Sequence, residues 1–161
     1  MKIIVVSGGF DPIHSGHIAY LKAANKLGDK LMVALNSDAW LVNKKGSYFM
    51  PFDERKLVLE NLSVVDKVFG FEDDEKSSAS NALIEIRDKY PNDDIIFANG
   101  GDRTQDNIPE MTVSGIEFIF SVGGEDKKNS SSSILKKWKY QDMERTWGKY
   151  NNLFVEKEVK V

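Results

Sequence analysis

Short apolar segments recur along the chain, and each is bounded by glycine, proline or a cluster of polar residues. They span residues 3–6, 31–35, 68–71, 95–98 and 116–120. Apolar runs of this length, rich in Ile, Val and Leu, are typical of strands buried in a parallel sheet. Between them, apolar residues at intervals of three and four predict helices over residues 15–27, 51–62 and 82–90. The alternation of strands and helices predicts an α/β fold.

Parts of the chain depart from this alternation. Residues 40–48 show no clear period and carry two adjacent lysines before a glycine, which favours a mobile loop. Near the end of the chain, the serines at 130–133 precede an amphipathic segment at 134–138. We therefore expect these serines at the N-terminus of a helix rather than in a flexible linker, which is the alternative for a serine run.

The composition is that of one globular domain of ordinary size: 161 residues, of which 41% are hydrophobic and 29% are charged. A net charge of -3 argues against a nucleic-acid-binding surface, which would be basic. The sequence has no cysteine, which excludes disulfides and thiolate metal sites and fits a reducing compartment. No apolar run is long enough for a bilayer span or a signal peptide, so we expect a cytoplasmic protein without a membrane partner.

The stretch with the most chemical content is residues 7–17, between the first apolar run and the first predicted helix. Gly8 and Gly9 allow the backbone to turn tightly and to approach a ligand, and the start of a helix attracts anions. His14 and His17 are the two histidines of the chain and lie three residues apart, so both rings can face one phosphate cluster. A glycine-rich turn with two surface histidines is the alternative. The combination within one loop favours a phosphate-binding site.

Residues 8–17, with the sequence GGFDPIHSGH, resemble the HxGH signature of the cytidylyltransferase-like nucleotidyltransferases. The resemblance implies a Rossmann-like domain: a three-layer, doubly wound sheet of five parallel strands in the order 3-2-1-4-5. It also implies an enzyme that joins a nucleoside triphosphate to a phosphorylated acceptor and releases pyrophosphate, with Mg²⁺ bridging phosphate oxygens. His14 and His17 would contact the triphosphate. The other contacts expected from this motif are Gly8, Gly9, Phe10 and Asp11.

Two central segments resemble further blocks of the family. In the family, a lysine in the loop corresponding to 40–48 closes over the triphosphate, so either Lys44 or Lys45 inherits this role. Adjacent lysines alone are more typical of a solvated surface. The segment PFDER at 51–55 resembles the block in which an arginine helps to build the site and the dimer, so Arg55 is carried over, although the default for an arginine on an amphipathic helix is the surface. Asp53 is expected to cap that helix.

The segment NGGDR at 99–103 lies where open α/β sheets bind ligands, at the carboxyl end of a predicted strand. It resembles the Lys-Gly-Gly-Asp-Tyr block of heptose-phosphate adenylyltransferases, with Asn99 and Arg103 in place of the lysine and the tyrosine. We expect Gly101, Asp102 and Arg103 at the site. Arg103 would pair with a phosphate as a planar fork. A plain turn is the alternative.

Ser131, Ser132 and Ser133 match in position the closing motif of the family, in which hydroxyls at a helix start bind the β- and γ-phosphates. Hydroxyls and unpaired N–H groups at a helix N-terminus suit a phosphate. The arginine that usually precedes this motif is missing. Lys127 or Lys128 is expected to replace it as a point charge.

The resemblance predicts a nucleotidyltransferase that uses ATP and a heptose 1-phosphate to make an ADP-heptose-type nucleotide sugar. Its partners would be the nucleoside triphosphate, a phosphorylated sugar or polyol, and a second copy in a homodimer. One alternative is a CTP-dependent cytidylyltransferase acting on glycerol 3-phosphate or another polyol phosphate. The other is a nucleotide-binding module without catalysis, against which the pair of imidazoles argues. No residues are assigned as metal ligands.

We expect a transferase domain over residues 1–140 and a C-terminal extension over residues 141–161. Within the extension, residues 144–153 resemble the Arg-Pro-Trp-Gly-x-Tyr opening of the cupin domain in mannose-6-phosphate isomerase-type enzymes, with Thr146 in place of the proline. The chain would then be the front part of a longer or formerly longer sugar-phosphate protein. An ordinary extension whose aromatic side chains pack on the domain or on a dimer partner is the alternative.

Overall fold

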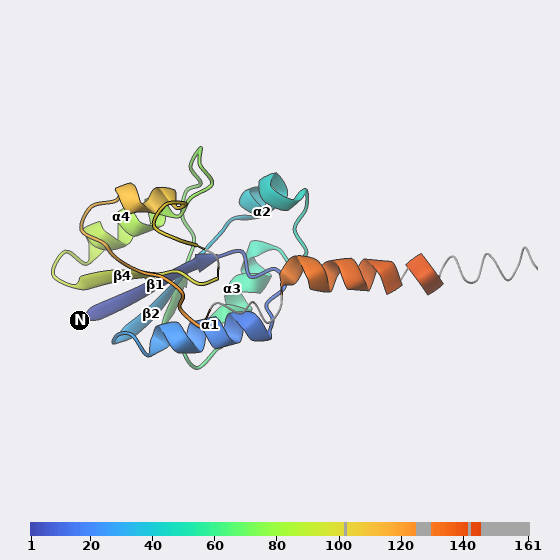
Figure 1. The fold of residues 1–161 in the computed structure, drawn as a ribbon, viewed down its shortest axis with the longest axis horizontal. Helices are drawn as coiled ribbons and strands as arrows, with labels where there is room; N and C mark the ends of the chain where they lie inside the picture. Colours follow the sequence, from blue (N-terminus) through green and yellow to red (C-terminus); the bar gives the residue numbers. More distant parts are fainter. Residues whose placement is uncertain (102, 125–129, 142, 146–161) are drawn as a thin grey trace, which may run out of the picture.

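A parallel sheet of five strands forms the centre of the molecule, in the spatial order β3-β2-β1-β4-β5. Figure 1 shows β2, β1 and β4 side by side. The computed structural model describes residues 1–101, 103–124, 130–141 and 143–145. The strands are β1 Lys2–Gly8, β2 Lys30–Leu35, β3 Lys67–Phe69, β4 Asp94–Ala98 and β5 Glu117–Ile119. The predicted fold class and strand order are confirmed. β3 and β5 are shorter than the apolar runs, because each lies at an edge of the sheet and pairs with one neighbour over three residues.

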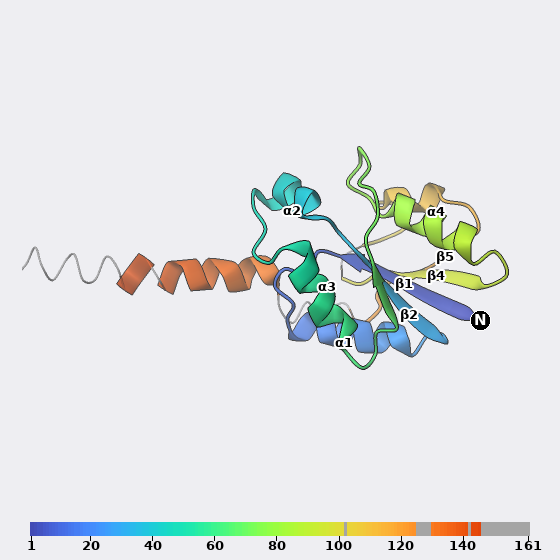
Figure 2. The ribbon, with the colours of Figure 1, turned by 180° about the vertical axis from the view of Figure 1, so that it is seen from behind.

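Helices cover both faces of the sheet. They are α1 Ser15–Asn25, α2 Asp38–Lys45, α3 Phe52–Glu60, α4 Ser80–Lys89 and the 3-10 helix η1 Pro109–Thr112. Figures 1 and 2 show α1 and α3 on one face and α4 on the other. Successive side chains of β1 point to opposite faces, so Ile4 and Val6 pack with α1 and α3, whereas Ile3 and Val5 pack with α4. This burial on both faces explains why the strands are continuously apolar in sequence.

Helix α2 covers residues 40–45 of the stretch that the sequence predicts as a mobile loop, so the prediction of a loop is wrong there, and residues 46–48 follow the helix. Ser37 caps the helix, since its Oγ accepts a hydrogen bond from the Trp40 backbone N at 3.0 Å. Gly46 ends the helix in the left-handed region, with a φ of +88°, which glycine adopts without steric cost. Leu41 is the buried residue of α2. A single buried residue produces no apolar period, so the pattern of the sequence does not reveal this helix.

Asp53 does not cap α3, contrary to the prediction. The N-cap of α3 is Pro51, and no side chain makes a capping hydrogen bond there. Asp53 and Glu54 instead lie in the first turn, where carboxylates interact favourably with the helix dipole. The acidic pair therefore marks the first turn of the helix, directly after the N-cap position.

A helix comprising residues 131–141 and 143–145 extends away from the sheet, coloured orange in Figures 1 and 2. It begins at the serine cluster, as predicted, and is still helical at the predicted domain boundary after residue 140. Trp138 and Tyr140 on this helix are 56% and 63% exposed. Residues 146–161, which hold most of the cupin-like segment, lie outside the described residues. None of the helices in the described ranges has the length and apolar composition that a bilayer crossing requires.

Candidate active site

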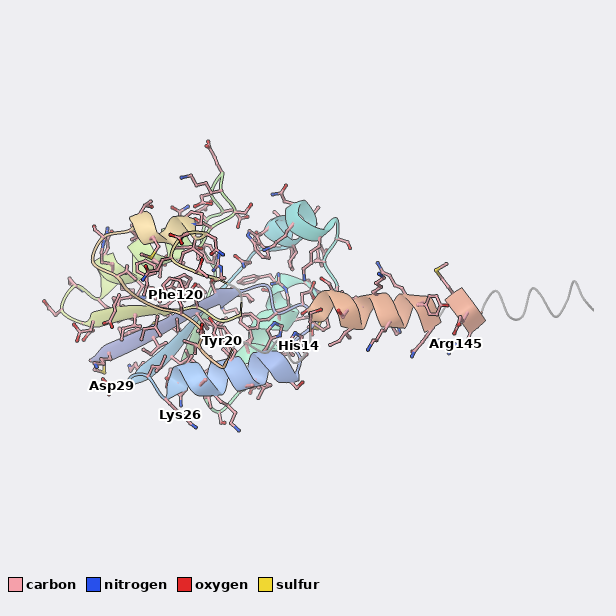
Figure 3. The ribbon with its side chains drawn as sticks, viewed as in Figure 1. His14, Tyr20, Lys26, Asp29, Phe120 and Arg145 are labelled. Carbon is pink, nitrogen blue, oxygen red and sulfur yellow. The ribbon has the colours of Figure 1, made fainter. Side chains whose placement is uncertain are left out.

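The candidate site is a cavity of about 440 Å³ at the carboxyl ends of β1 and β4, where the strand order reverses. Its walls come from the β1–α1 loop, α2, the loops after β4 and β5, and the start of the C-terminal helix. Figure 3 shows His14 at the start of α1 and Tyr20 further along the same helix. The predicted site residues that line this cavity are Gly9, Phe10, His14, His17, Lys44, Lys45, Gly101, Arg103, Ser131 and Ser132.

His14 and His17 form the N-terminal cap of α1 between them. The Nδ1 of His14 accepts hydrogen bonds from the backbone N of Gly16 at 3.1 Å and of His17 at 3.4 Å. In return, the Nδ1 of His17 accepts from the backbone N of His14 at 3.3 Å. The two rings are stacked, with centroids 3.8 Å apart and planes 21° from parallel. The three-residue spacing therefore brings both imidazoles to the same wall of the cavity.

This cap determines which ring nitrogen of each histidine carries the hydrogen. A backbone N–H can only donate, so each Nδ1 must be an acceptor. A neutral imidazole with an accepting Nδ1 carries its hydrogen on Nε2. Both histidines are therefore set up as Nε2–H donors, which is the state that a phosphate oxygen requires of a neutral imidazole.

Close packing explains the two glycines of the turn. A Cβ added to Gly8 would lie 2.9 Å from the Phe10 ring, and one added to Gly9 would lie 2.7 Å from Cδ2 of Leu41. Phe10 is buried, and its ring centroid lies 4.8 Å from that of His17. Phe10 and Leu41 thus fill the space beside the glycines and support the histidine wall of the cavity.

Arg55 lies behind the cavity and is 1% exposed, so it is not the surface residue that its helix position suggests. Its Nη1 donates to the carbonyl oxygens of Gly9 at 2.9 Å and of Asn36 at 2.8 Å. Its Nε donates to the carbonyl of Met50 at 2.9 Å, and its Nη2 forms a salt bridge with Asp38 Oδ1 at 2.7 Å. One guanidinium therefore joins the glycine turn, the end of β2, the start of α2 and the α2–α3 loop.

Asp11 is also buried and holds the same α2–α3 loop. Its two carboxylate oxygens accept hydrogen bonds from the backbone N of Phe49 and of Met50, each at 2.6 Å. Its side chain is 2% exposed and does not line the cavity described above. The structure thus gives Asp11 and Arg55 loop-holding contacts beneath the site.

The last turn of α2 carries Lys44 and Lys45 to the cavity. The Nζ of Lys44 lies 4.6 Å from the centroid of the Trp40 ring, a cation–π distance. Trp40 is itself anchored, since its Nε1 donates to the carbonyl of Ser77 at 2.9 Å. The two lysines therefore reach the cavity from a short, anchored helix.

The loop after β4 brings Gly101 and Arg103 into the cavity. Gly101 has a φ of +66°, in the left-handed region that favours glycine. The Nη2 of Arg103 lies 3.3 Å from Oε1 of Glu110, in η1. Sequence reasoning misses Glu110, because a lone glutamate after a proline carries no recognisable signal. Asp102, predicted at the site, lies outside the described residues, as does Lys128.

The serine cluster meets the glycine loop at the start of the C-terminal helix. Ser131 is 7% exposed, and its hydroxyl donates to the carbonyl of Pro12 at 2.7 Å. The Ser130 hydroxyl accepts from the backbone N of Ser133 at 3.0 Å, which is a capping contact. Ser132 lines the cavity with Ser131, and Ser133 is absent from the described lining. The first turn of this helix therefore faces the cavity with two of the three predicted serines.

Tyr20 lines the cavity and is a residue that sequence reasoning misses, because it appears there as an ordinary helix position. Its hydroxyl donates to the carbonyl of Ala98, at the end of β4. Burial raises the pKa of Tyr20 well above its usual range, although the Arg103 charge opposes this effect. Tyr20 is therefore neutral and holds α1 to β4 rather than acting as a base.

A family model described as Cytidylyltransferase-like matches residues 5–138. The bifunctional protein HldE of Yersinia enterocolitica is 38% identical over 128 residues, which are 78% of this chain and 24% of that protein. HldE of Erwinia tasmaniensis is 40% identical over 138 residues, covering 78% of this chain and 29% of that protein. The chain thus spans about a quarter of the length of these curated relatives.

Solved structures with a similar fold include the lipopolysaccharide core biosynthesis protein of Thermoplasma volcanium. It is 25% identical with a TM-score of 0.60, and the match covers 78% of this chain and 99% of that one. A bifunctional NMN adenylyltransferase/ADP ribose pyrophosphatase of Francisella tularensis has a TM-score of 0.59 at 18% identity, over 84% of this chain and 41% of that one. At that identity the second likeness shows the fold alone.

Proposed function

The chain belongs to the cytidylyltransferase-like family of nucleotidyltransferases, and we propose that it transfers an adenylyl group from ATP to a heptose 1-phosphate. The products would be an ADP-heptose and pyrophosphate. The identity to the HldE proteins supports this choice of substrates, as does the resemblance of residues 99–103 to a block of heptose-phosphate adenylyltransferases. The nucleotide would occupy the cavity at the carboxyl ends of β1 and β4.

The observation that carries the proposal is the histidine pair at the start of α1. His14 and His17 are stacked in the cavity wall with each Nδ1 occupied by a backbone N–H. Two Nε2–H donors next to a helix N-terminus are suited to the negative charge that develops on a triphosphate during transfer.

The proposed reaction is a direct in-line displacement. An oxygen of the acceptor phosphate attacks the α-phosphorus of ATP, and the bond from that phosphorus to the bridging oxygen breaks. The electron pair of this bond leaves with pyrophosphate, so no covalent enzyme intermediate forms. Catalysis would come from positioning and charge stabilisation, with His14 and His17 donating to the triphosphate and Lys44 or Lys45 neutralising it.

The other predicted contacts divide into cavity residues and supporting residues. Ser131 and Ser132 would bind phosphate oxygens at the start of their helix, and Gly101 and Arg103 would do so from the loop after β4. Ser133, Asp102 and Lys128 stay predictions from the sequence. The residues that we propose to shape the site from behind are Gly8, Gly9, Phe10, Asp11 and Arg55.

We propose that Mg²⁺ accompanies the triphosphate. In the described part of the chain, no cluster of three or more His, Asp or Glu side chains is placed to hold a metal ion. Mg²⁺ usually keeps several waters and binds substrate phosphates with one or two carboxylates at most. The ion would therefore be carried by the nucleotide. We assign Asp11 to holding the α2–α3 loop rather than to binding the ion, because both of its carboxylate oxygens accept backbone N–H groups.

A second candidate is a CTP-dependent transferase acting on glycerol 3-phosphate or another polyol phosphate. Asn99 and Arg103 depart from the lysine and tyrosine of the heptose-type block, which weakens the argument for a heptose acceptor and keeps this candidate open. The candidates are separated by measuring pyrophosphate release with each pairing of ATP or CTP with heptose 1-phosphate or glycerol 3-phosphate. We expect the highest kcat/KM with ATP and heptose 1-phosphate. A preference for CTP and glycerol 3-phosphate would reverse the assignment, and nucleotide binding without any release would indicate a binding module.

We also propose that the protein forms a homodimer and works in the cytoplasm, where nucleoside triphosphates are made. Support for the dimer comes from large apolar side chains that the isolated chain leaves exposed near the C-terminal helix. Phe49 is 50% exposed, Trp138 is 56% and Met143 is 57% exposed. Phe49, in the α2–α3 loop, lies beside Trp138 of the C-terminal helix, and exposed apolar groups gathered in one patch are typical of a protein interface. Sedimentation of the full chain would measure the assembly directly.

A further inference from the structure

Arg103 enters the cavity with its guanidinium held by two buried side chains. Its Nη2 donates to Oε1 of Glu110 at 3.3 Å, and its Nη1 donates to Oδ1 of Asn99 at 3.5 Å. The Arg103 side chain is 38% exposed, whereas Glu110 and Asn99 are 1% and 2% exposed. These bonds use one hydrogen on each terminal nitrogen of a group with five N–H donors. The guanidinium is thus fixed at one edge and can still donate to a ligand.

Glu110 is buried in η1 at a position that the mechanism above does not use. Its Oε1 also accepts from the backbone N of Ala79 at 2.9 Å, at the start of α4. Its Oε2 is buried and has no hydrogen-bond partner among the described residues. A buried carboxylate is costly unless a positive charge compensates it, and Arg103 is its salt-bridge partner. Glu110 therefore draws the Arg103 guanidinium to one place in the cavity wall.

Asn99 holds the other side of the guanidinium and is itself rigidly placed. Its Nδ2 lies 3.4 Å from the carbonyl oxygens of both Phe97 and Ile119. Because the amide nitrogen faces these acceptors, the amide oxygen faces Arg103. The Asn99 backbone N donates to Ile119 at 2.8 Å, and its carbonyl accepts from Val122 at 2.9 Å. The support for Arg103 is thus built into the ends of β4 and β5.

The loop that carries Arg103 packs against the histidine-bearing helix. A Cβ added at Gly100, in this loop, would lie 3.1 Å from the Tyr20 ring, and one added at Gly123, in the neighbouring loop after β5, would lie 3.2 Å from the Tyr20 Cα. Arg103, Tyr20 and His17 line the same cavity, so the guanidinium faces α1 across it. Tyr20 follows His17 by three residues, which places both on one face of that helix. A phosphate bound by His17 would therefore lie on the side of α1 that Arg103 faces.

We propose that Glu110 is a positioning residue that, together with Asn99, holds Arg103 so that its planar fork binds the phosphates of the nucleoside triphosphate. Two parallel N–H donors to one phosphate add both strength and geometric specificity. This inference rests on the proposed function in taking a nucleoside triphosphate as the ligand of the cavity. It does not depend on which acceptor is used.

The test is the affinity for ATP and for CTP without acceptor, measured by titration calorimetry. The variants are Arg103→Ala, Glu110→Gln and the double variant. The control is Glu117→Gln, which removes the same negative charge from an exposed position on β5. We expect Arg103→Ala to lower the affinity by about tenfold to hundredfold for whichever of ATP and CTP binds the wild type more tightly. Glu110→Gln should weaken it about three- to tenfold when Arg103 is present and should have no effect in the Arg103→Ala background. Glu117→Gln should bind like the wild type.

Opposite results would overturn the proposal. If Glu110 acted only as a negative charge near the site, it would repel the nucleotide. Glu110→Gln would then bind the nucleotide more tightly. Equal weakening in both backgrounds would show a merely structural role. Unchanged affinity in Arg103→Ala would remove Arg103 from the nucleotide and favour the acceptor phosphate as its partner.

A further variant covers the case in which Glu110→Gln does not fold, as judged by thermal melting without ligand. Arg103→Lys keeps the charge beside Glu110 but replaces the fork by a point charge. The proposal predicts weaker nucleotide binding for Arg103→Lys, and wild-type affinity would contradict it. Failure of transfer to heptose 1-phosphate would refute the proposed function alone, since none of these affinities involves an acceptor.

Discussion

At the scale of single residues, His14 contributes both to the fold and to the cavity. Its Nδ1 accepts two backbone N–H groups at the start of α1, while its ring is stacked on His17 in the cavity wall. These contributions are separable, because asparagine is among the preferred N-cap residues and has no group equivalent to the Nε2–H of the imidazole. A substitution that keeps the cap can therefore isolate the phosphate contact.

We predict that His14→Asn and His14→Ala lose similar activity and differ in stability. Pyrophosphate release should fall by about 10²- to 10³-fold in both, because each lacks a donor to the triphosphate. The free energy of unfolding should fall by about 0.5–2 kcal/mol in His14→Ala and by much less in His14→Asn, which keeps the cap. Urea denaturation and a pyrophosphate assay measure the two effects. Wild-type turnover in His14→Asn would show that the imidazole has no role in transfer.

The sequence reveals the histidine pair but not the residues that support it, and the reason is the separation of their partners. The glycines, the histidines and the start of α1 lie within one short stretch, so their local pattern predicts their association. The partners of Arg55 lie at Gly9, Asn36, Asp38 and Met50, which only the completed sheet brings together. Contacts of this kind leave no local pattern in a single sequence, and the same holds for Glu110.

For Arg55, we predict that replacement by methionine costs stability first and activity as a consequence. The carbonyl oxygens of Gly9, Asn36 and Met50 and the Asp38 carboxylate would lose their donor. The free energy of unfolding should drop by about 3–5 kcal/mol. Lys56→Met at the neighbouring position, where the lysine side chain is 40% exposed, should change it by less than about 0.5 kcal/mol. An Arg55→Met protein as stable as Lys56→Met would contradict the loop-holding role.

At the scale of elements, α2 shows how a short helix can present charged residues to a cavity. The Ser37 cap, the buried Leu41 and the Trp40 hydrogen bond to Ser77 hold it, and its last turn carries both lysines. The longer helices are predictable from their apolar periods, since each buries a stripe of side chains against the sheet. With one buried side chain, α2 has no such period, and only its serine start and glycine end mark it.

The double variant Lys44→Ala/Lys45→Ala should lose turnover and keep its fold. Removing the positive charges next to the triphosphate should lower pyrophosphate release by about 10²-fold or more. Thermal stability should hardly change, because neither lysine is among the buried residues of α2. The control is Lys22→Ala/Lys26→Ala, which removes the same charge from exposed positions at the far end of α1. Equal turnover in the two double variants would exclude a role for the α2 lysines.

At the scale of the whole molecule, connectivity determines where the cavity lies. Parallel strands joined by right-handed crossovers place the β1–α1 and β4 loops at the same edge, where the order reverses. The alternation of strands and helices predicts the parallel α/β class, whereas the strand order is implied by the resemblance to the family. The C-terminal helix is different, because it extends beyond the sheet (Figure 2). Its aromatic side chains Trp138 and Tyr140 are exposed.

We predict that residues beyond Tyr140 are dispensable for transfer and for assembly. A chain that ends at Tyr140 keeps the cavity, the serine cluster and Trp138 of the exposed surface. Its rate of pyrophosphate release should equal that of the full chain. Sedimentation should show the same number of chains in each assembly. Lost activity or dissociation would show instead that the extension belongs to the working enzyme, whether or not it resembles the start of a cupin domain.

The central claim is that this cavity joins a nucleotide to a sugar phosphate, and the most direct measurement is phosphorus NMR of the reaction products. With ATP and heptose 1-phosphate, we predict equal amounts of pyrophosphate and of a diphosphate that links adenosine to the sugar. His17→Ala, which lacks one donor of the histidine pair, should form both products about 10²- to 10³-fold more slowly. Release of pyrophosphate without the mixed diphosphate, or equal rates in the two proteins, would contradict the account.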